Sequence, residues 1–129
     1  ARLNTVEMYD PQADSWQRVA SMPRGRSYHA AAAMGGKIYV TGGATDQATV
    51  SSAYVYDPQA DAWTQLASMG IARRTHASAA VDGKLYVFGG YAATGGRLST
   101  AEVYDPASDS WAQVTSLTSV RNSMVAVAL

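Results

Sequence analysis

Short apolar stretches alternate with turn-forming residues along the whole chain. Asp10, Pro11 and Asp14 belong to one such turn, where proline fixes φ and aspartate bonds nearby backbone amides. The pairs Gly35-Gly36 and Asp82-Gly83 are signals for tight hairpins. The stretches between the turns predict eleven strands, at residues 3–9, 16–20, 29–34, 37–42, 51–56, 62–67, 75–81, 84–88, 98–104, 110–115 and 121–129.

The same residues return at a fixed spacing. Tyr-Asp-Pro at 9–11 recurs at 56–58 and 104–106, at intervals of 47 and 48 residues. Three other features keep this spacing, namely Trp16, Trp63 and Trp111, then Arg26, Arg73 and Arg121, and the diglycines at 42–43 and 89–90. A period that unlike residue types share is an internal repeat.

The repeated unit reads Gly-Lys-(Ile/Leu)-Tyr-Val-x-Gly-Gly, then Tyr-Asp-Pro-x-x-Asp-x-Trp, then Met or Leu four residues before Arg. Over almost the whole chain it resembles the kelch repeat. The resemblance implies an all-β kelch β-propeller with one four-stranded antiparallel blade per repeat. Residues 1–20 are then the third and fourth strands of a partial blade, 26–68 and 73–116 are full blades, and 121–129 is the inner strand of a further blade.

Eleven strands make just under three blades, whereas propellers close with roughly four to eight. An open arc exposes apolar blade faces and strand edges. We therefore expect the chain to be part of a six-bladed ring, either as a piece of a longer polypeptide or through several copies that close the ring together. In the second case we expect a head-to-tail homodimer, with residues 1–20 of one copy against 121–129 of the other.

Composition narrows the possible partners and chemistry. Ten basic and ten acidic side chains give zero net charge, which argues against general binding to nucleic acid or to an anionic membrane. No apolar run approaches the roughly 20 residues of a membrane helix. Because the chain has no cysteine, it has no disulfide, thiolate metal site or cysteine nucleophile. We expect neither a metal nor a cofactor.

Most periodic residues are expected to serve the fold. Each diglycine is predicted to end a strand with positive φ or against a neighbouring blade, rather than to bind phosphate. The periodic tryptophans and tyrosines are expected to fill the space between blades, and the periodic aspartates to belong to turns. His29 and His76, whose place in the third repeat is taken by Met124, are expected to be structural.

Arg26, Arg73 and Arg121 each precede an inner strand, so all three are expected to face one end of the ring around its axis. In kelch proteins that resemble the substrate adaptors of ubiquitin ligases, arginines at this place contact acidic peptides. The planar guanidinium fork suits carboxylates. In the alternative, which is equally consistent with the repeat, each arginine bonds loop carbonyls of the adjacent blade.

Two loops at the same end, 44–50 and 91–97, differ in sequence although everything around them repeats. Variation on a repeated scaffold favours specificity there. Tyr91 directly follows its diglycine, where adaptor-type kelch domains often carry a ligand-contacting tyrosine, and Arg97 closes the loop. Ala44 takes the place of Tyr91 in the other repeat, which departs from that pattern. Tyr91 and Arg97 join the three arginines as candidate ligand-binding residues.

The sequence thus predicts a non-catalytic kelch module that binds a protein or an acidic peptide. One alternative is a kelch-fold enzyme resembling sialic-acid mutarotases, in which arginine binds a sugar carboxylate and His29 or His76 transfers a proton. Another is a purely self-assembling fragment without a ligand. The enzyme requires an arginine and a histidine or glutamate in one polar pocket at the axis, and histidines buried between blades would exclude it.

Overall fold

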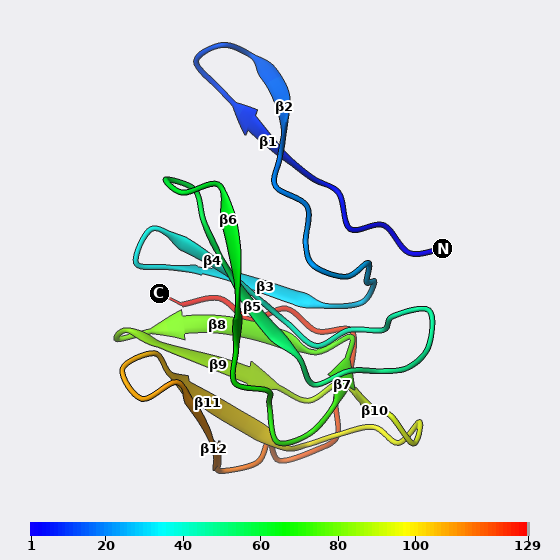
Figure 1. Ribbon diagram of the computed structural model, residues 1–129. Helices are drawn as coiled ribbons and strands as arrows, with labels where there is room; N and C mark the ends of the chain where they lie inside the picture. The colour runs from blue at the N-terminus through cyan, green and yellow to red at the C-terminus, as the bar shows by residue number, and fades with distance from the viewer. Residues whose placement is uncertain (129) are drawn as a thin grey trace.

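The computed structural model describes residues 1–128, which form β-strands and no helix (Figure 1). A hairpin begins the chain, followed by two four-stranded antiparallel sheets. The hairpin pairs β1 (Val6–Asp10) with β2 (Ser15–Val19). The first sheet holds β3 (Ala30–Met34), β4 (Lys37–Thr41), β5 (Ala53–Asp57) and β6 (Ala62–Leu66), and the second holds β8 (Ala77–Val81), β9 (Lys84–Phe88), β11 (Ala101–Asp105) and β12 (Ser110–Val114). Short β7 (Arg73–Arg74) pairs with β10 (Tyr91–Ala92).

Each outer hairpin is closed by an aspartate in the left-handed region. Asp14, Asp61 and Asp109 have φ of 48°, 47° and 46°, a conformation that aspartate adopts at lower cost than most residues. In each hairpin the aspartate also accepts a hydrogen bond from the hydroxyl of the periodic tyrosine, at 2.6 to 2.8 Å. The Tyr-Asp-Pro-x-x-Asp motif therefore specifies a rigid turn.

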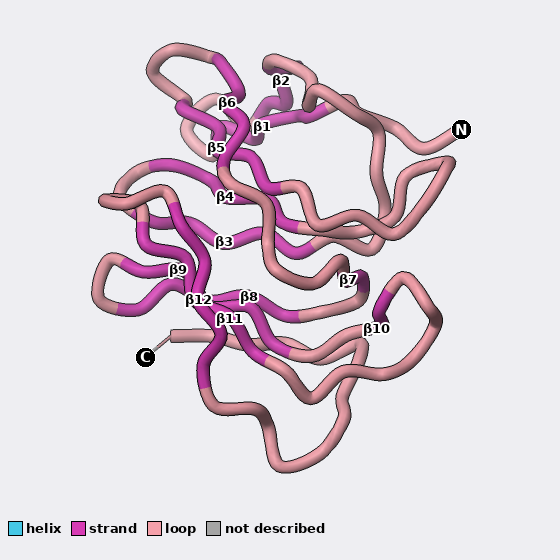
Figure 2. The backbone as a smooth tube through the Cα atoms, turned by 60° about the horizontal axis from the view of Figure 1, so that its bottom comes forward, coloured by secondary structure: helices cyan, strands magenta, loops and turns pink. Residues whose placement is uncertain are grey.

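The two sheets pack face to face as adjacent blades. Leu85 is fully buried and forms a core cluster with Tyr39 and Tyr104. The innermost strands β3 and β8 lie side by side, as both views show (Figures 1 and 2). These strands consist mainly of alanine, because the backbones approach each other closely here and leave room only for small side chains.

A recurring polar contact joins each blade to the one before it. Trp63 Nε1 donates to the Ala20 carbonyl at 2.8 Å, and the Asp61 carboxylate accepts from the Ala20 amide at 2.8 Å. One blade later, Trp111 and Asp109 bond the carbonyl and amide of Ala67 at 2.8 and 3.0 Å. We call this Asp and Trp pair the backbone clamp, since it holds both polar backbone atoms of one residue.

The predicted strands agree with the structure within three residues at their ends, but 121–129 does not. Over residues 121–128 the structure has no strand. Arg121 forms a bridge with Leu98, its carbonyl accepts a hydrogen bond from the Gly90 amide, and the Ser123 amide donates to the Thr75 carbonyl. Leu129 lies outside the described residues. The segment has no second strand to pair with among residues 1–128, so no ladder forms. The small strands β7 and β10 were not predicted.

The clamp should carry much of the stability between blades. Replacing Trp111 by alanine is expected to lower the free energy of unfolding by about 3 kcal/mol, because a half-buried ring and its bond to Ala67 are both lost. Trp111→Phe keeps most of the packing and should cost less. Chemical denaturation measures both, and a Trp111→Phe variant as stable as the unmodified chain would contradict the role of the indole N–H.

Candidate functional site

Arg73 lies in the interior, with no exposed surface. Its Nη1 donates to the carbonyls of Gly89 and Thr100, at 2.8 and 3.0 Å. Its Nη2 donates to Glu102 at 2.9 Å, forming an ion pair that is almost completely buried. The Glu102 carboxylate also accepts the amides of Gly70 and Ile71, so it ties the loop that enters this blade to the third strand.

Arg26 is buried in the same way in the preceding blade. Its Nη1 donates to the Gly42 carbonyl at 2.8 Å, and its Nη2 donates to the Ser52 hydroxyl at 3.2 Å. The guanidinium lies 4.9 Å from the ring centre of Tyr54, which takes the place of Glu102 in this repeat. Both arginines therefore match the bracing alternative, because their donors are directed at loop carbonyls. The sequence expectation that these two side chains contact a ligand does not fit this burial.

Arg121 differs from the other two, because its side chain is exposed. Its backbone is fixed by the bond from its amide to the Leu98 carbonyl at 3.0 Å and by the bond from the Gly90 amide to its own carbonyl at 2.6 Å. Arg121 therefore stands at a defined place beside Leu98, with its side chain exposed to solvent.

The diglycines show both expected features, a positive φ and close contact with a neighbouring blade. Gly42 and Gly43 have φ of 59° and 95°, and Gly89 and Gly90 repeat these values closely at 60° and 93°. A Cβ on Gly42 would stand 2.4 Å from the Arg73 carbonyl oxygen, which lies in the next blade. These positions admit glycine alone and bring adjacent blades into contact.

His76 is buried between the blades. Its Nε2 lies 2.9 Å from the hydroxyl of Thr41 in the adjacent sheet. Burial, together with the charge of Arg73 and the nearby His29, lowers the pKa of His76 to about 3, so the ring is neutral at physiological pH. This position argues against His76 as a proton-transfer group.

A partly exposed cluster at the loop end of the blades unites two predicted residues with one that the sequence analysis missed. We call Arg74, Tyr91 and Arg97 the arginine–tyrosine cluster. The guanidinium groups of Arg74 and Arg97 lie 6.0 and 5.9 Å from the ring centre of Tyr91. Arg97 Nε also donates to the Tyr91 hydroxyl at 3.2 Å.

The backbone holds this cluster in place. Tyr91 of β10 is paired with Arg74 of β7, and an isolated bridge pairs Tyr91 with Arg97. Arg74 also reaches Thr49, in the variable loop of the preceding blade, at 3.4 Å. Figure 1 shows β7, β10 and the loop between β4 and β5 at the same end of the sheets. The cluster thus connects the two loops whose sequences break the repeat.

Arg74 could have been found from the sequence by its departure from the period. The corresponding positions hold Ser27 and Asn122, so an arginine appears once where the repeat has small polar residues. The sequence analysis instead selected the arginines that recur in every repeat as candidates.

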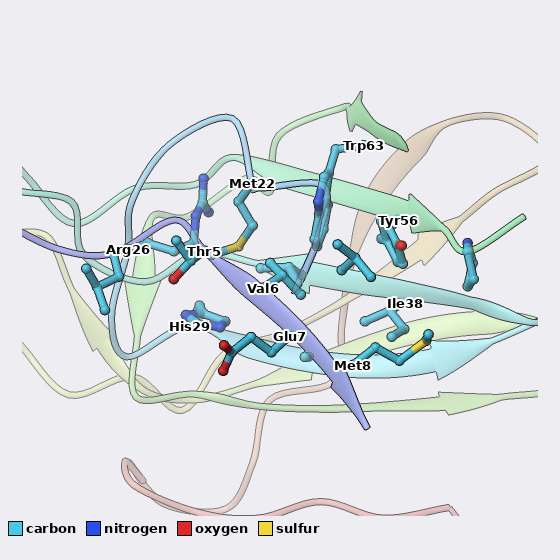
Figure 3. A pocket seen from close by; sticks show the side chains of 15 residues that line it. Thr5, Val6, Glu7, Met8, Met22, Arg26, His29, Ile38, Tyr56 and Trp63 are labelled. Atoms are coloured by element: carbon cyan, nitrogen blue, oxygen red, sulfur yellow. The ribbon is translucent and has the colours of Figure 1, made fainter. Parts of the chain in front are cut away.

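A second feature is a mainly apolar cavity of about 500 Å³ between β1 and the β3–β6 sheet. Its walls include Val6, Met8, Ile38 and Trp63, while Glu7 and His29 lie toward one end (Figure 3). Among residues 1–128, β1 pairs with β2 only, so its other edge faces this space.

The comparison with known families agrees with the repeat pattern and the blade geometry. A family model described as the KLHDC2/KLHL20/DRC7 Kelch-repeats domain matches residues 1–126. This chain belongs to the kelch-repeat family. A comparison with curated proteins found no match. Kelch-repeat domains are generally protein-interaction modules built as propellers.

Two further findings concern membranes and metals. No helix that could cross a membrane occurs within residues 1–128. In the same part of the chain, no three His, Asp or Glu side chains are grouped so that they could hold a metal ion.

Replacing Arg73 by alanine should destabilise the fold by about 3 to 5 kcal/mol, because Glu102 is left as an unpaired buried charge. Arg73→Ala combined with Glu102→Gln should recover part of the loss. Arg97→Ala, at an exposed position, serves as the control and should leave the denaturation midpoint unchanged. A small effect of Arg73→Ala would show that the ion pair does not brace the blade.

His76 should make the fold sensitive to mild acid. Its folded pKa lies below the unfolded value of about 6.5, so the unfolded chain binds the proton more readily. Stability is therefore full above pH 6.5 and falls as the pH drops toward 3, by about 2 kcal/mol at pH 5.

The matched variant is His76→Met, which places the residue of the third repeat at this position. It should reduce the slope of the stability profile between pH 7 and 5 in thermal melting, and the slope that remains comes from His29, whose pKa is also lowered by burial. Hydrogen bonds from the amides of Ala20 and Ala67 lower the pKa of Asp61 and Asp109 below the usual value for aspartate. Protonation of these carboxylates therefore affects stability only at more acidic pH. An unchanged slope in His76→Met would contradict the assignment.

Proposed function

We propose that this chain is a non-catalytic kelch scaffold that binds an acidic protein or peptide segment at the arginine–tyrosine cluster. The observation that carries the proposal is the placement of two guanidinium groups, that of exposed Arg97 and that of half-buried Arg74, beside one tyrosine. Among residues 1–128, neither Arg74 nor Arg97 forms an ion pair with a carboxylate. Both cations are thus available to a ligand.

The geometry suits a carboxylate. Arg97 donates its Nε hydrogen to the Tyr91 hydroxyl, so its two terminal nitrogens remain available to bind a carboxylate. Contact with the Tyr91 ring orients both guanidinium groups and lowers the entropy lost when they bind. Thr49 adds a hydroxyl from the neighbouring blade.

The five residues expected from the sequence divide between two roles in this proposal. Tyr91 and Arg97 contact the ligand, and Arg121, which is exposed, adds positive charge at the next blade. Arg26 and Arg73 hold the loops that carry the site, so they act on binding through the scaffold.

Self-association is the second part of the proposed function. Tyr9 is 42% exposed, whereas the corresponding Tyr56 and Tyr104 are 5% and 2% exposed. Trp16 is 67% exposed, whereas the corresponding Trp63 and Trp111 are half-buried. Solvent exposure of residues that are core elsewhere favours a partner on that face. A head-to-tail homodimer that closes a ring would cover it.

A fluorescent hexaglutamate peptide tests the acidic specificity, with hexaglutamine as the matched neutral probe. We expect salt-sensitive binding of hexaglutamate and a loss of about tenfold in affinity for Arg74→Ala or Arg97→Ala. Lys84→Ala removes the same charge at the hairpin between β8 and β9, away from the cluster, and should have little effect. Equal affinity for both peptides, or equal losses in all three variants, would overturn the proposal.

A further inference from the structure

The Asp and Trp pair of the backbone clamp occurs three times in the chain, and among residues 1–128 two of these pairs hold a residue. In the two occupied copies, Asp61 with Trp63 holds Ala20, and Asp109 with Trp111 holds Ala67. The third copy is Asp14 with Trp16 on the outer hairpin β1–β2. Within residues 1–128, no group bonds to the indole N–H of Trp16.

The third clamp has the same geometry as the occupied ones. The rings of Tyr9 and Trp16 have centres 5.2 Å apart with a 42° angle between their planes. The corresponding pairs in the other blades have centres 5.1 Å apart at 39° and 44°. The Tyr9 hydroxyl donates to Asp14 at 2.6 Å, as in the occupied copies. The clamp is therefore preorganised to receive a backbone.

The other end of the chain offers the matching group. Thr115 follows β12 at the position that Ala20 and Ala67 hold after β2 and β6. Ala20 and Ala67 are both clamped by the next blade. No hydrogen bond of the Thr115 amide or carbonyl is found among the described residues.

The apolar surface near Thr115 resembles the surface on which the two sheets meet inside the chain. Where the two sheets meet inside the chain, Tyr104 and Trp111 pack against a face that includes Tyr39, Val55 and Leu66. The same face of the second sheet presents half-buried residues at the corresponding positions, namely Tyr86, Val103 and Val114. Tyr9 and Trp16 can meet this surface as Tyr104 and Trp111 meet theirs.

We propose that the Asp14–Trp16 clamp binds the backbone of Thr115 in a second copy of this chain. The indole N–H of Trp16 donates to the Thr115 carbonyl, and the Asp14 carboxylate accepts from the Thr115 amide. The inference rests on the proposed self-association and specifies its contact. A second copy is the occupant because it carries Thr115, which holds the place of Ala20 and Ala67 and whose amide and carbonyl form no hydrogen bond among the described residues. Two such contacts, related by a two-fold axis, close a dimer.

Because the chain has no cysteine, single cysteines can report this contact. Ser15→Cys lies between the two clamp residues, and Thr115→Cys marks the bound backbone. A mixture of the two variants, treated with a short bismaleimide, should give a covalent dimer, whereas each variant alone should not. An Ala20→Cys and Ala62→Cys double variant calibrates the reagent on an occupied clamp within one chain.

Light scattering on the unmodified chain supplies the second measurement. We expect twice the 13.6 kDa of one chain, and a rise of roughly a thousandfold in the dissociation constant for Trp16→Ala, since two hot-spot contacts are lost per dimer. Gln17→Ala, at an exposed neighbour on the opposite side of β2, is the control. Circular dichroism checks that each variant is folded.

The outcomes distinguish the clamp contact from the broader proposal that the chain self-associates. A dimer that Trp16→Ala leaves intact, without crosslinking in the mixture, overturns the clamp contact while self-association stands. A folded monomer at all concentrations overturns both. Neither outcome affects binding of acidic peptides, which is measured at another end of the blades.

Discussion

The interaction on which this structure depends is the clamp that each blade places on the backbone of the one before it. An indole N–H and a carboxylate bond the carbonyl and amide of a single residue, at Ala20 and again at Ala67. These polar groups lie just past a strand, where no ladder partner is available, and the clamp satisfies them. Since it recognises main chain, it places little demand on the clamped side chain, so the same joint can be used at every blade.

The buried arginines provide a second constraint that supports the loops. Arg26 and Arg73 both donate to the carbonyl of the first glycine of a diglycine. The second partner differs, because Arg26 packs on the ring of Tyr54 whereas Arg73 forms an ion pair with Glu102. The repeat therefore tolerates a change of partner as long as the guanidinium is satisfied. With the scaffold fixed in this way, residues that break the period, such as Arg74 and Tyr91, are available for binding.

Sequence periodicity predicted the strands, the order of the sheets and the reasons for the glycines, because these follow from local turn chemistry and from packing that every repeat shares. It could not decide the role of the recurring arginines. Spacing places Arg26 and Arg73 at one end of the blades, but whether a long side chain turns inward depends on carbonyls that the fold brings together. The same limit applied to Arg74, whose partner Tyr91 approaches only through the pairing of β7 with β10. The segment 121–128 carries an inner-strand sequence without a ladder, since strand formation needs a paired neighbour.

Amide hydrogen exchange at Ala67 and Thr115 tests the clamp most directly, because the two residues hold equivalent places and differ in whether the chain itself clamps them. At low protein concentration, the account predicts slow exchange at Ala67 and fast exchange at Thr115. Raising the concentration should slow exchange at Thr115 while leaving Ala67 unchanged. Fast exchange at Ala67 in the folded protein, at any concentration, would contradict the account.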